Sequence, residues 1–219
     1  MSEQLTEDVT QETVLSTQVE SKDLTMWNDP NVLQRSWKAA KMLASSDLVP
    51  RTYKKPENCL IALDVAGRIG WSPLAVMQNL NIVHGNPAWS GQACIAMING
   101  CGRFMPLQFK FSGEKGKDNW QCIASTTRVC DGAECTSSPV TWKMAKDEGW
   151  VDRKDKEGKP CSKWLTIPEQ MMMYRAGAFF ARVYCPDVLQ GIYIREEIED
   201  VYGQEIQEKT TVKIQSQND

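Results

Sequence analysis

Histidine is nearly missing from this sequence, which contains a single one, His84, among its 219 residues. A catalytic or metal site built from several imidazoles is therefore excluded, and a cysteine–histidine pair would have only this one base, beside an expected turn. A phosphate loop of the form GxxxxGK[ST] is absent as well. The nearest stretch, GEKGK at residues 113–117, has the wrong spacing and lies between two expected strands, so no machinery for ATP hydrolysis is visible.

Long hydrophobic runs are also missing, and no stretch approaches the roughly 18 apolar residues of a membrane-spanning helix. The first residues have neither the basic start nor the apolar centre of a secretory signal, so we expect a cytoplasmic protein with no membrane partner. Eight cysteines occur without a CxxC pair, and we expect them to be reduced thiols. Zinc at Cys122, Cys130 and Cys135 is the weaker alternative, because their spacing matches no finger-like pattern.

Acidic residues gather at the two ends of the chain. Residues 1–26 carry six acids and one lysine, a net charge of −5, and residues 191–219 carry seven acids and three bases, a net charge of −4. The segment 27–190 has 21 Lys and Arg against 15 Asp and Glu, a net charge of +6. A basic body between acidic ends suggests a polyanionic partner, although solubility tails on an ordinary domain would produce the same pattern.

Turn and capping residues divide the body into short elements. Helix starts are predicted at Asp29-Pro30, at Pro56, at Ser72-Pro73 and at Ser90, with Gly70 as a helix end and Gly85-Asn86 as the turn of a hairpin. Further along, we expect strands at 104–111, 120–129 and 133–142, a short helix at 142–150, a charged loop at 151–163 and a long helix at 166–184.

The order of these elements shows no alternation of strand and helix. It therefore predicts an α+β fold with a short β-hairpin, a small antiparallel sheet and packed helices. We expect one domain at residues 27–202, between an acidic N-terminal tail at 1–26 and a C-terminal tail at 203–219. Both tails are rich in polar residues and poor in large apolar ones, which predicts disorder.

The long helix at 166–184 carries two arginines on one stripe, Arg175 and Arg182, while most of its other positions are apolar or small. Arginines on a largely buried helix require anionic partners, because an unpaired buried charge is unstable by several kcal/mol. A DNA phosphate and a carboxylate of the protein itself are both open as that partner.

The other candidate DNA contacts are chosen because they are basic or, in one case, because the residue has an aromatic ring. The loop at 151–163 places several cations beside Trp164, and single-stranded nucleic acid requires both cations for its phosphates and flat rings for its bases. The candidates chosen in this way are Arg51, Lys54, Lys55, Lys143, Lys146, Lys163 and Trp164. An ordinary solvated loop is the alternative for the charged segment, and core packing is the alternative for Trp120, Trp142 and Trp150.

Several stretches taken together resemble the RecT family of phage recombinases. The segment from Leu48 to Ile98, which contains PRTYK and GWSP, resembles the N-terminal half of these proteins. A second segment, SKWLTIPEQMMMYRAGAFFARVYCPDVLQGIY, resembles their C-terminal element through Trp164, Pro168, Met172, Arg175, Pro186, Asp187 and Gly191. The resemblance covers about residues 47–202.

The resemblance implies a single-strand annealing protein with a core like that of RecT and the phage lambda Bet protein. It implies ATP-independent binding of single-stranded DNA, annealing of complementary strands, assembly into rings or helical filaments, and a partner exonuclease in a phage or prophage. By the motif, Arg175 is the best candidate for a phosphate contact and Lys54 matches a second basic position. No cofactor is expected, and a modulatory role for Mg²⁺ is left open.

Two other functions are compatible with the sequence. The first is a metal-dependent nuclease of the same kind of phage module, which needs clustered carboxylates for divalent ions. The body offers Asp64, Asp147, Glu148 and Glu169 for this role, without a recognisable cluster. The pairs Glu196/Glu197 and Glu199/Asp200 could hold a hydrated divalent ion, but we expect them on a solvated helix face. The second is a generic cytoplasmic interaction domain whose basic surface binds another protein.

Overall fold

The computed structural model describes residues 25–83, 85–154 and 157–198. A short helix α1 (Thr25–Asn28) comes first, so the described body begins two residues before the expected boundary, and Met26 is already buried. The rest of the expected N-terminal tail, the domain end at residue 202 and the tail at 203–219 lie outside the described residues.

A helical lobe forms from the first half of the chain. It contains α2 (Pro30–Ser45), the 3-10 turn η1 (Arg51–Tyr53), α3 (Pro56–Ile69) and α4 (Pro73–Asn79). The predicted starts are confirmed, because the side chains of Asp29 and Ser72 accept hydrogen bonds from the first-turn amides of Asn31 and Ala75. Gly70 ends α3 in the left-handed conformation, with φ of 72°.

A hairpin of β1 (Leu80–Val83) and β2 (Asn86–Trp89) connects this lobe to the rest of the protein. Val83 pairs with Asn86, so Asn86, which was expected in the turn, belongs to the strand. A third strand, β7 (Tyr193–Ile194), pairs with β2 in parallel. The sequence predicted antiparallel strands alone, and this parallel pair corrects that prediction. The strand β7 was missed because it comes from the far end of the described chain.

The second lobe has an antiparallel sheet and the long helix. Its elements are α5 (Gly91–Gly100), β3 (Gln108–Ser112), β4 (Gln121–Thr127), β5 (Glu134–Thr136), β6 (Val140–Thr141), α6 (Trp142–Asp147), α7 (Lys163–Thr166), α8 (Pro168–Tyr184) and the 3-10 turn η2 (Pro186–Leu189). β4 is central and pairs with β3, β5 and β6, so the third strand expected from the sequence is two short strands. The α+β class is therefore correct.

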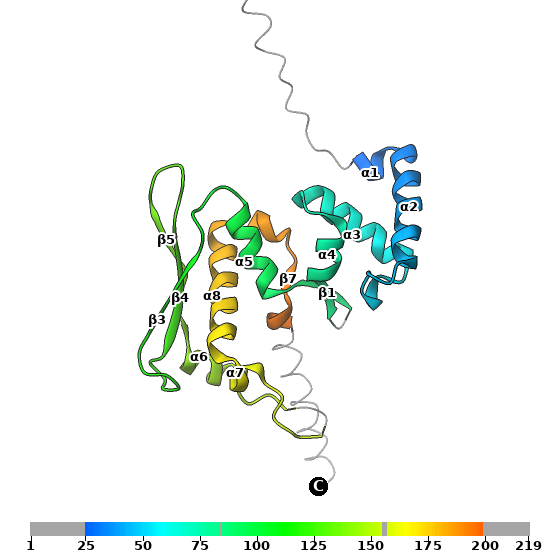
Figure 1. Ribbon diagram of the computed structural model, residues 1–219. Coiled ribbons are helices and arrows are strands. Elements are labelled where there is room, and N and C mark those ends of the chain that lie inside the picture. Colours follow the sequence, from blue (N-terminus) through cyan, green and yellow to red (C-terminus); the bar gives the residue numbers. More distant parts are fainter. Residues whose placement is uncertain (1–24, 84, 155–156, 199–219) are drawn as a thin grey trace, which may run out of the picture.

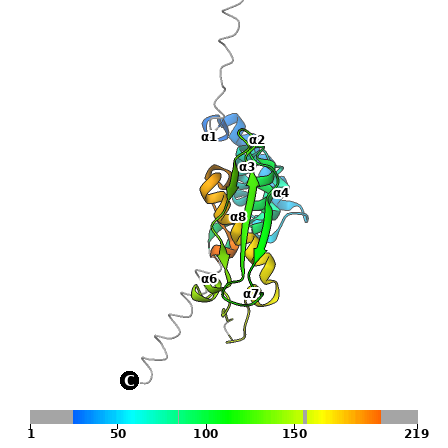
Figure 2. The same cartoon turned by 90° about the vertical axis from the view of Figure 1, so that its left-hand side faces the viewer.

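Helix α8 lies between the sheet and α5 (Figure 1). In Figure 2 the sheet is the front layer and α8 lies behind it. Buried residues of both lobes form one contiguous hydrophobic core. The helices α5 and α8 approach closely at Gly91, where an added Cβ would lie 2.5 Å from Tyr174 Cγ. No single helix in the described ranges is long and apolar enough to cross a membrane.

Candidate nucleic-acid interface

Two of the nine predicted DNA-contact residues are buried. Trp164 is 1% exposed, and its ring packs against those of Trp142 and Trp150 at centroid distances of 6.4 and 5.2 Å. A ring enclosed by other rings offers no free face to a base, so the expected stacking role of Trp164 does not fit this structure. The core alternative holds for Trp120 and Trp150, which are also buried.

The anionic partner of Arg175 is a carboxylate of the protein itself, which is one of the two possibilities considered from the sequence. It is 6% exposed, its Nη1 lies 3.3 Å from Glu197 Oε1, and its guanidinium carbon lies 4.0 Å from the centroid of the Trp150 ring. The best candidate for a phosphate contact is therefore held inside the protein by a carboxylate. Arg182 Nη2 is 2.5 Å from Glu197 Oε2, but nearly half of its side chain is exposed.

Three of the predicted lysines form ion pairs at the surface. Lys143 pairs with Asp147 and Lys146 pairs with Asp118, while Lys54 Nζ lies 3.5 Å from Asp47 Oδ1. The hydrogen bond that Lys143 donates to Asp147 raises the pKa of Lys143, and the hydrogen bond that Asp118 accepts from Lys146 lowers the pKa of Asp118. Exposed pairs contribute roughly 0–1 kcal/mol, so a DNA phosphate can replace the carboxylates at little energetic cost.

Arg51, Lys55 and Lys163 are exposed, and none of them forms an ion pair within the described ranges. Arg51 and Lys55 flank η1, directly after α2. They project from the helical lobe, whereas Lys163 starts α7 in the other lobe. The predicted site residues are therefore not one cluster: the structure places free cations on both lobes.

Helix α2 carries a basic surface whose residues are not among the DNA-contact candidates chosen from the sequence. Arg35, Lys38 and Lys41 are exposed on the side of the helix opposite Ala40 and Ala44, which are buried. The helix contains no acidic residue between Pro30 and Ser45. This surface of α2 is therefore positive along its length, and the absence of acids over 16 residues is the signal in the sequence that would have identified it.

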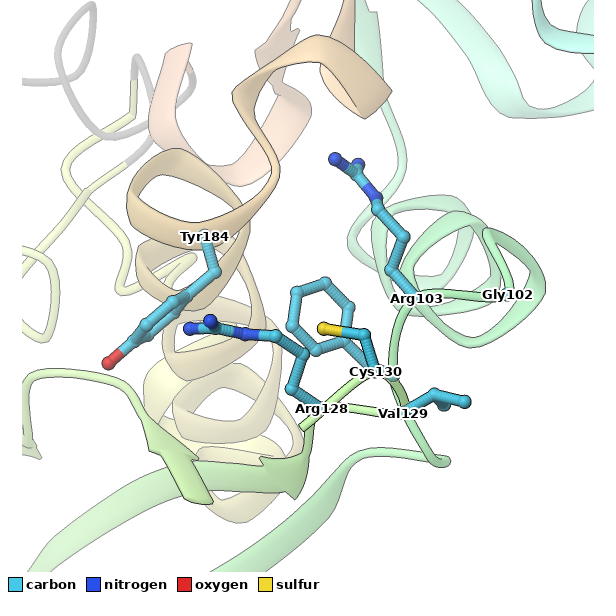
Figure 3. Close-up of a pocket in the computed structure, with 7 residues that line it drawn as sticks. Gly102, Arg103, Arg128, Val129, Cys130 and Tyr184 are labelled. Carbon is cyan, nitrogen blue, oxygen red and sulfur yellow. The ribbon is translucent and has the colours of Figure 1, made fainter. Parts of the chain in front are cut away.

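A cavity of about 350 Å³ lies at the C-terminal end of α8, and we call it the Arg103–Arg128 cavity. It is lined by Gly102, Arg103, Phe104, Arg128, Val129, Cys130 and Tyr184 (Figure 3). Neither arginine was selected from the sequence, because the two are 25 positions apart and meet only through the bridge between Phe104 and Arg128.

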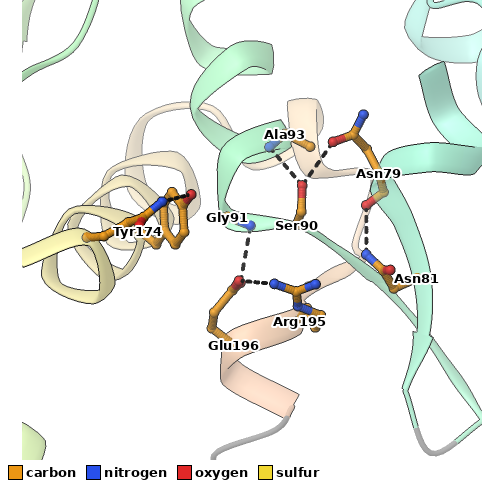
Figure 4. A network of polar contacts seen from close by, with 9 residues as sticks. Asn79, Asn81, Ser90, Gly91, Ala93, Tyr174, Arg195 and Glu196 are labelled. Carbon is orange, nitrogen blue, oxygen red and sulfur yellow. Dashed lines mark hydrogen bonds and ion pairs between the residues drawn. The ribbon is translucent and has the colours of Figure 1, made fainter. Parts of the chain in front are cut away.

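Glu196 and Glu197 do not lie on a solvated helix face, as was expected, but are 2% and 8% exposed. Glu196 Oε2 accepts a hydrogen bond from the Gly91 amide at the start of α5 (3.1 Å), and its Oε1 accepts one from Arg195 Nη2 (3.0 Å) (Figure 4). The two carboxylates thus neutralise arginines and a helix N-terminus. Glu199 and Asp200 lie outside the described residues.

In the described part of the chain, no group of three or more His, Cys, Asp and Glu side chains is arranged to hold a metal ion. Cys122 and Cys135 are buried thiols of the sheet, and burial raises the pKa of Cys122 to about 12. Compared with known proteins, the chain matches no protein-family model, no curated protein and no solved structure.

Proposed function

We propose that this protein binds single-stranded DNA and anneals complementary strands without ATP, as RecT-type recombinases do. In this proposal the fold is a RecT/Bet-like annealing core, and the protein acts as a multimer in the cytoplasm of a bacterial host. A phage exonuclease supplies the single strands. The chain itself makes and breaks no covalent bond, so it is not an enzyme, and it requires no cofactor.

The observation that carries the proposal is the acid-free basic surface of α2. Arg35, Lys38 and Lys41 follow one another along the exposed side of the helix. Arg51 and Lys55 come next in the chain, after Asp47, whose carboxylate pairs with Lys54. A row of cations on a helix that contains no acidic residue suits a phosphate backbone, which repeats its charge along the strand. The ordered motifs that resemble the RecT family provide the second support.

The proposal is tested by mixing two complementary oligonucleotides, each with one dye, and following annealing without ATP over a series of salt concentrations. The variant replaces Arg35, Lys38 and Lys41 with Gln. Each lost contact to single-stranded DNA should reduce the slope of log K against log salt by about 0.7, so the triple variant should lose about 2 units of slope.

A matched control removes the same charge from the other lobe, by replacing Lys110, Lys115 and Lys117 with Gln. Two of these lysines form exposed ion pairs, with Glu134 and Glu169. The control should keep the slope and the annealing rate. An equal loss in both triple variants would mean that only net charge matters, and absence of annealing and of DNA binding at low salt would reject the proposal.

The alternatives predict different results in the same assay. A metal-dependent nuclease would shorten the labelled strands once Mg²⁺ is added, which a denaturing gel detects. A generic interaction domain would show neither DNA-dependent assembly nor annealing. Intact strands with rapid, salt-sensitive annealing favour the annealing protein over both alternatives.

A further inference from the structure

The Arg103–Arg128 cavity has cationic walls and no carboxylate among its lining residues. Arg103 Nη2 lies 3.0 Å from both Oδ1 and Oδ2 of Asp187, and Arg128 Nη1 lies 3.2 Å from Asp131 Oδ2. Neither aspartate lines the cavity, and both ion pairs are substantially exposed. Because exposed ion pairs are weak, an anionic ligand can replace the two aspartates as the partner of the guanidiniums without a large loss of stability.

The floor of the cavity is apolar and aromatic, and the surrounding contacts hold it in place. The ring of Phe104 packs edge-on against Phe180 at 5.3 Å, and the ring of Tyr184 packs on the same Phe180 at 4.7 Å. The Tyr184 hydroxyl donates to Thr136 O (3.2 Å) and accepts from Thr136 N (3.4 Å). The floor is therefore preformed, which reduces the entropic cost of binding a flat ligand.

The orientation of Arg128 adds to this arrangement. Its Nη2 donates a hydrogen bond to Cys135 Sγ (3.6 Å), which anchors the guanidinium at the sheet. In Figure 3 the side chains of Arg128 and Tyr184 point toward each other across the cavity, while Arg103 extends from the opposite wall. A planar guanidinium and a phenol ring are both surfaces on which a nucleobase stacks.

We propose that the Arg103–Arg128 cavity binds one nucleotide, with its base against the Tyr184 floor and its phosphate at the two guanidiniums. The volume of about 350 Å³ is at the small end of ligand pockets, which run from about 300 to 1,000 Å³, and so suits a single nucleotide unit. The ligand is either a free mononucleotide or one nucleotide of a single-stranded DNA. The second source rests on the proposed function, and the first does not.

Two exposed cysteines allow a direct test, since Cys130 lines the cavity and Cys161 lies outside it. The native protein is alkylated with and without dTMP, a short oligothymidylate or inorganic phosphate, and both sites are quantified by peptide mass spectrometry. Ligand at about ten times its Kd should slow alkylation of Cys130 about tenfold. The rate at Cys161 should stay the same, which provides the internal control.

Matched variants distinguish binding in the cavity from nonspecific binding of DNA elsewhere on the protein surface. Arg103→Gln together with Arg128→Gln should abolish the protection of Cys130 and leave oligothymidylate binding, measured by anisotropy, largely intact. The control is Arg68→Gln, because Arg68 is an exposed arginine that also pairs with an aspartate, Asp64, but lies outside the cavity. Protection of Cys130 should persist in this control.

The outcomes distinguish the two ligand sources and the two proposals. Protection by dTMP supports a mononucleotide site even if no annealing is found, whereas protection by oligothymidylate alone supports a nucleotide within a strand. Oligothymidylate binding without protection of Cys130 overturns the cavity proposal and leaves the proposed function standing. Equal protection by inorganic phosphate, or protection that survives the double substitution, also overturns it.

Discussion

Glu197 and Arg175 form an ion pair in the interior of the protein, with 3.3 Å between Glu197 Oε1 and Arg175 Nη1. Only 10% and 7% of their side chains are exposed. The other oxygen of Glu197 accepts hydrogen bonds from Arg182 and from the Ile194 amide. The end of the described chain is thereby attached to α8, and this attachment explains how a buried helix accommodates an arginine.

Replacing Glu197 with Gln should strongly destabilise the protein. The amide keeps the shape of the side chain but leaves the charge of Arg175 without its carboxylate, and breaking a buried pair in this way costs about 3–5 kcal/mol. Urea unfolding measures the change. Glu169→Gln is the control, because the pair of Glu169 with Lys115 is exposed and should contribute less than about 1 kcal/mol. Similar stabilities of the two variants would contradict the assignment.

Gly91→Ala should destabilise the contact between α5 and α8. The added Cβ would lie 2.5 Å from Cγ and 2.7 Å from Cβ of Tyr174, atoms near the backbone that cannot simply rotate away. We expect a loss of about 1–3 kcal/mol in thermal or urea unfolding. Gly100→Ala, in the same helix but with no atom within 4 Å of the new Cβ, should instead be neutral or slightly stabilising. A stable Gly91→Ala variant would rule out this close approach.

Tyr53 should make stability depend on pH in the alkaline range. Burial raises the pKa of Tyr53 to about 12, and its hydroxyl donates a 2.6 Å hydrogen bond to Leu80 O. The unfolded tyrosine ionises near pH 10 while the folded one remains neutral, so its stabilising contribution is complete below pH 10 and is lost as pH rises toward 12. The loss should be on the order of 2 kcal/mol.

The comparison that isolates this effect is Tyr53→Phe. The variant should be less stable at neutral pH by about 1–2 kcal/mol, because Leu80 O loses its donor. Its unfolding free energy should fall less steeply than that of the original protein between pH 10 and 12. Parallel curves for the two proteins over this range would show that Tyr53 does not titrate as its burial implies.

The exposed cations of the helical lobe should matter more for DNA binding than the paired lysines of α6. Within the residues that the structure describes, Arg51 and Lys55 have no ion pair to break, whereas Lys143 and Lys146 must exchange Asp147 and Asp118 for phosphates. We expect Arg51→Gln with Lys55→Gln to weaken single-stranded DNA binding more than Lys143→Gln with Lys146→Gln does, as measured by anisotropy at low salt. The reverse order of affinities would place the DNA-binding surface on the second lobe, which contains the antiparallel sheet.

Local signals in the sequence predicted much of the helical framework. Asp29, Ser72 and Ser90 cap helices as expected, because a capping side chain bonds to amides only two or three residues away. Gly70 ends its helix for an equally local reason, the low cost of a positive φ for glycine.

The errors involve partners that are distant in sequence. The strand β7 has only two residues and pairs with β2 more than 100 positions earlier, so no periodic pattern reveals it. Trp164 follows a charged loop, but the surrounding tryptophans bury it. For Arg175 the sequence left a phosphate and a carboxylate equally open, and only the position of Glu197 in space shows which one is present.

The sequence by itself determined the α+β class, the helix starts and the basic character of the body, since these depend on neighbouring residues and on composition. The tertiary structure decided which cations stay available to a partner. It turns Arg175 inward, pairs Lys146 with the distant Asp118, and leaves the α2 surface exposed. The physical reason is that the state of a charge depends on its nearest opposite charge in space, and the chain order does not specify that neighbour.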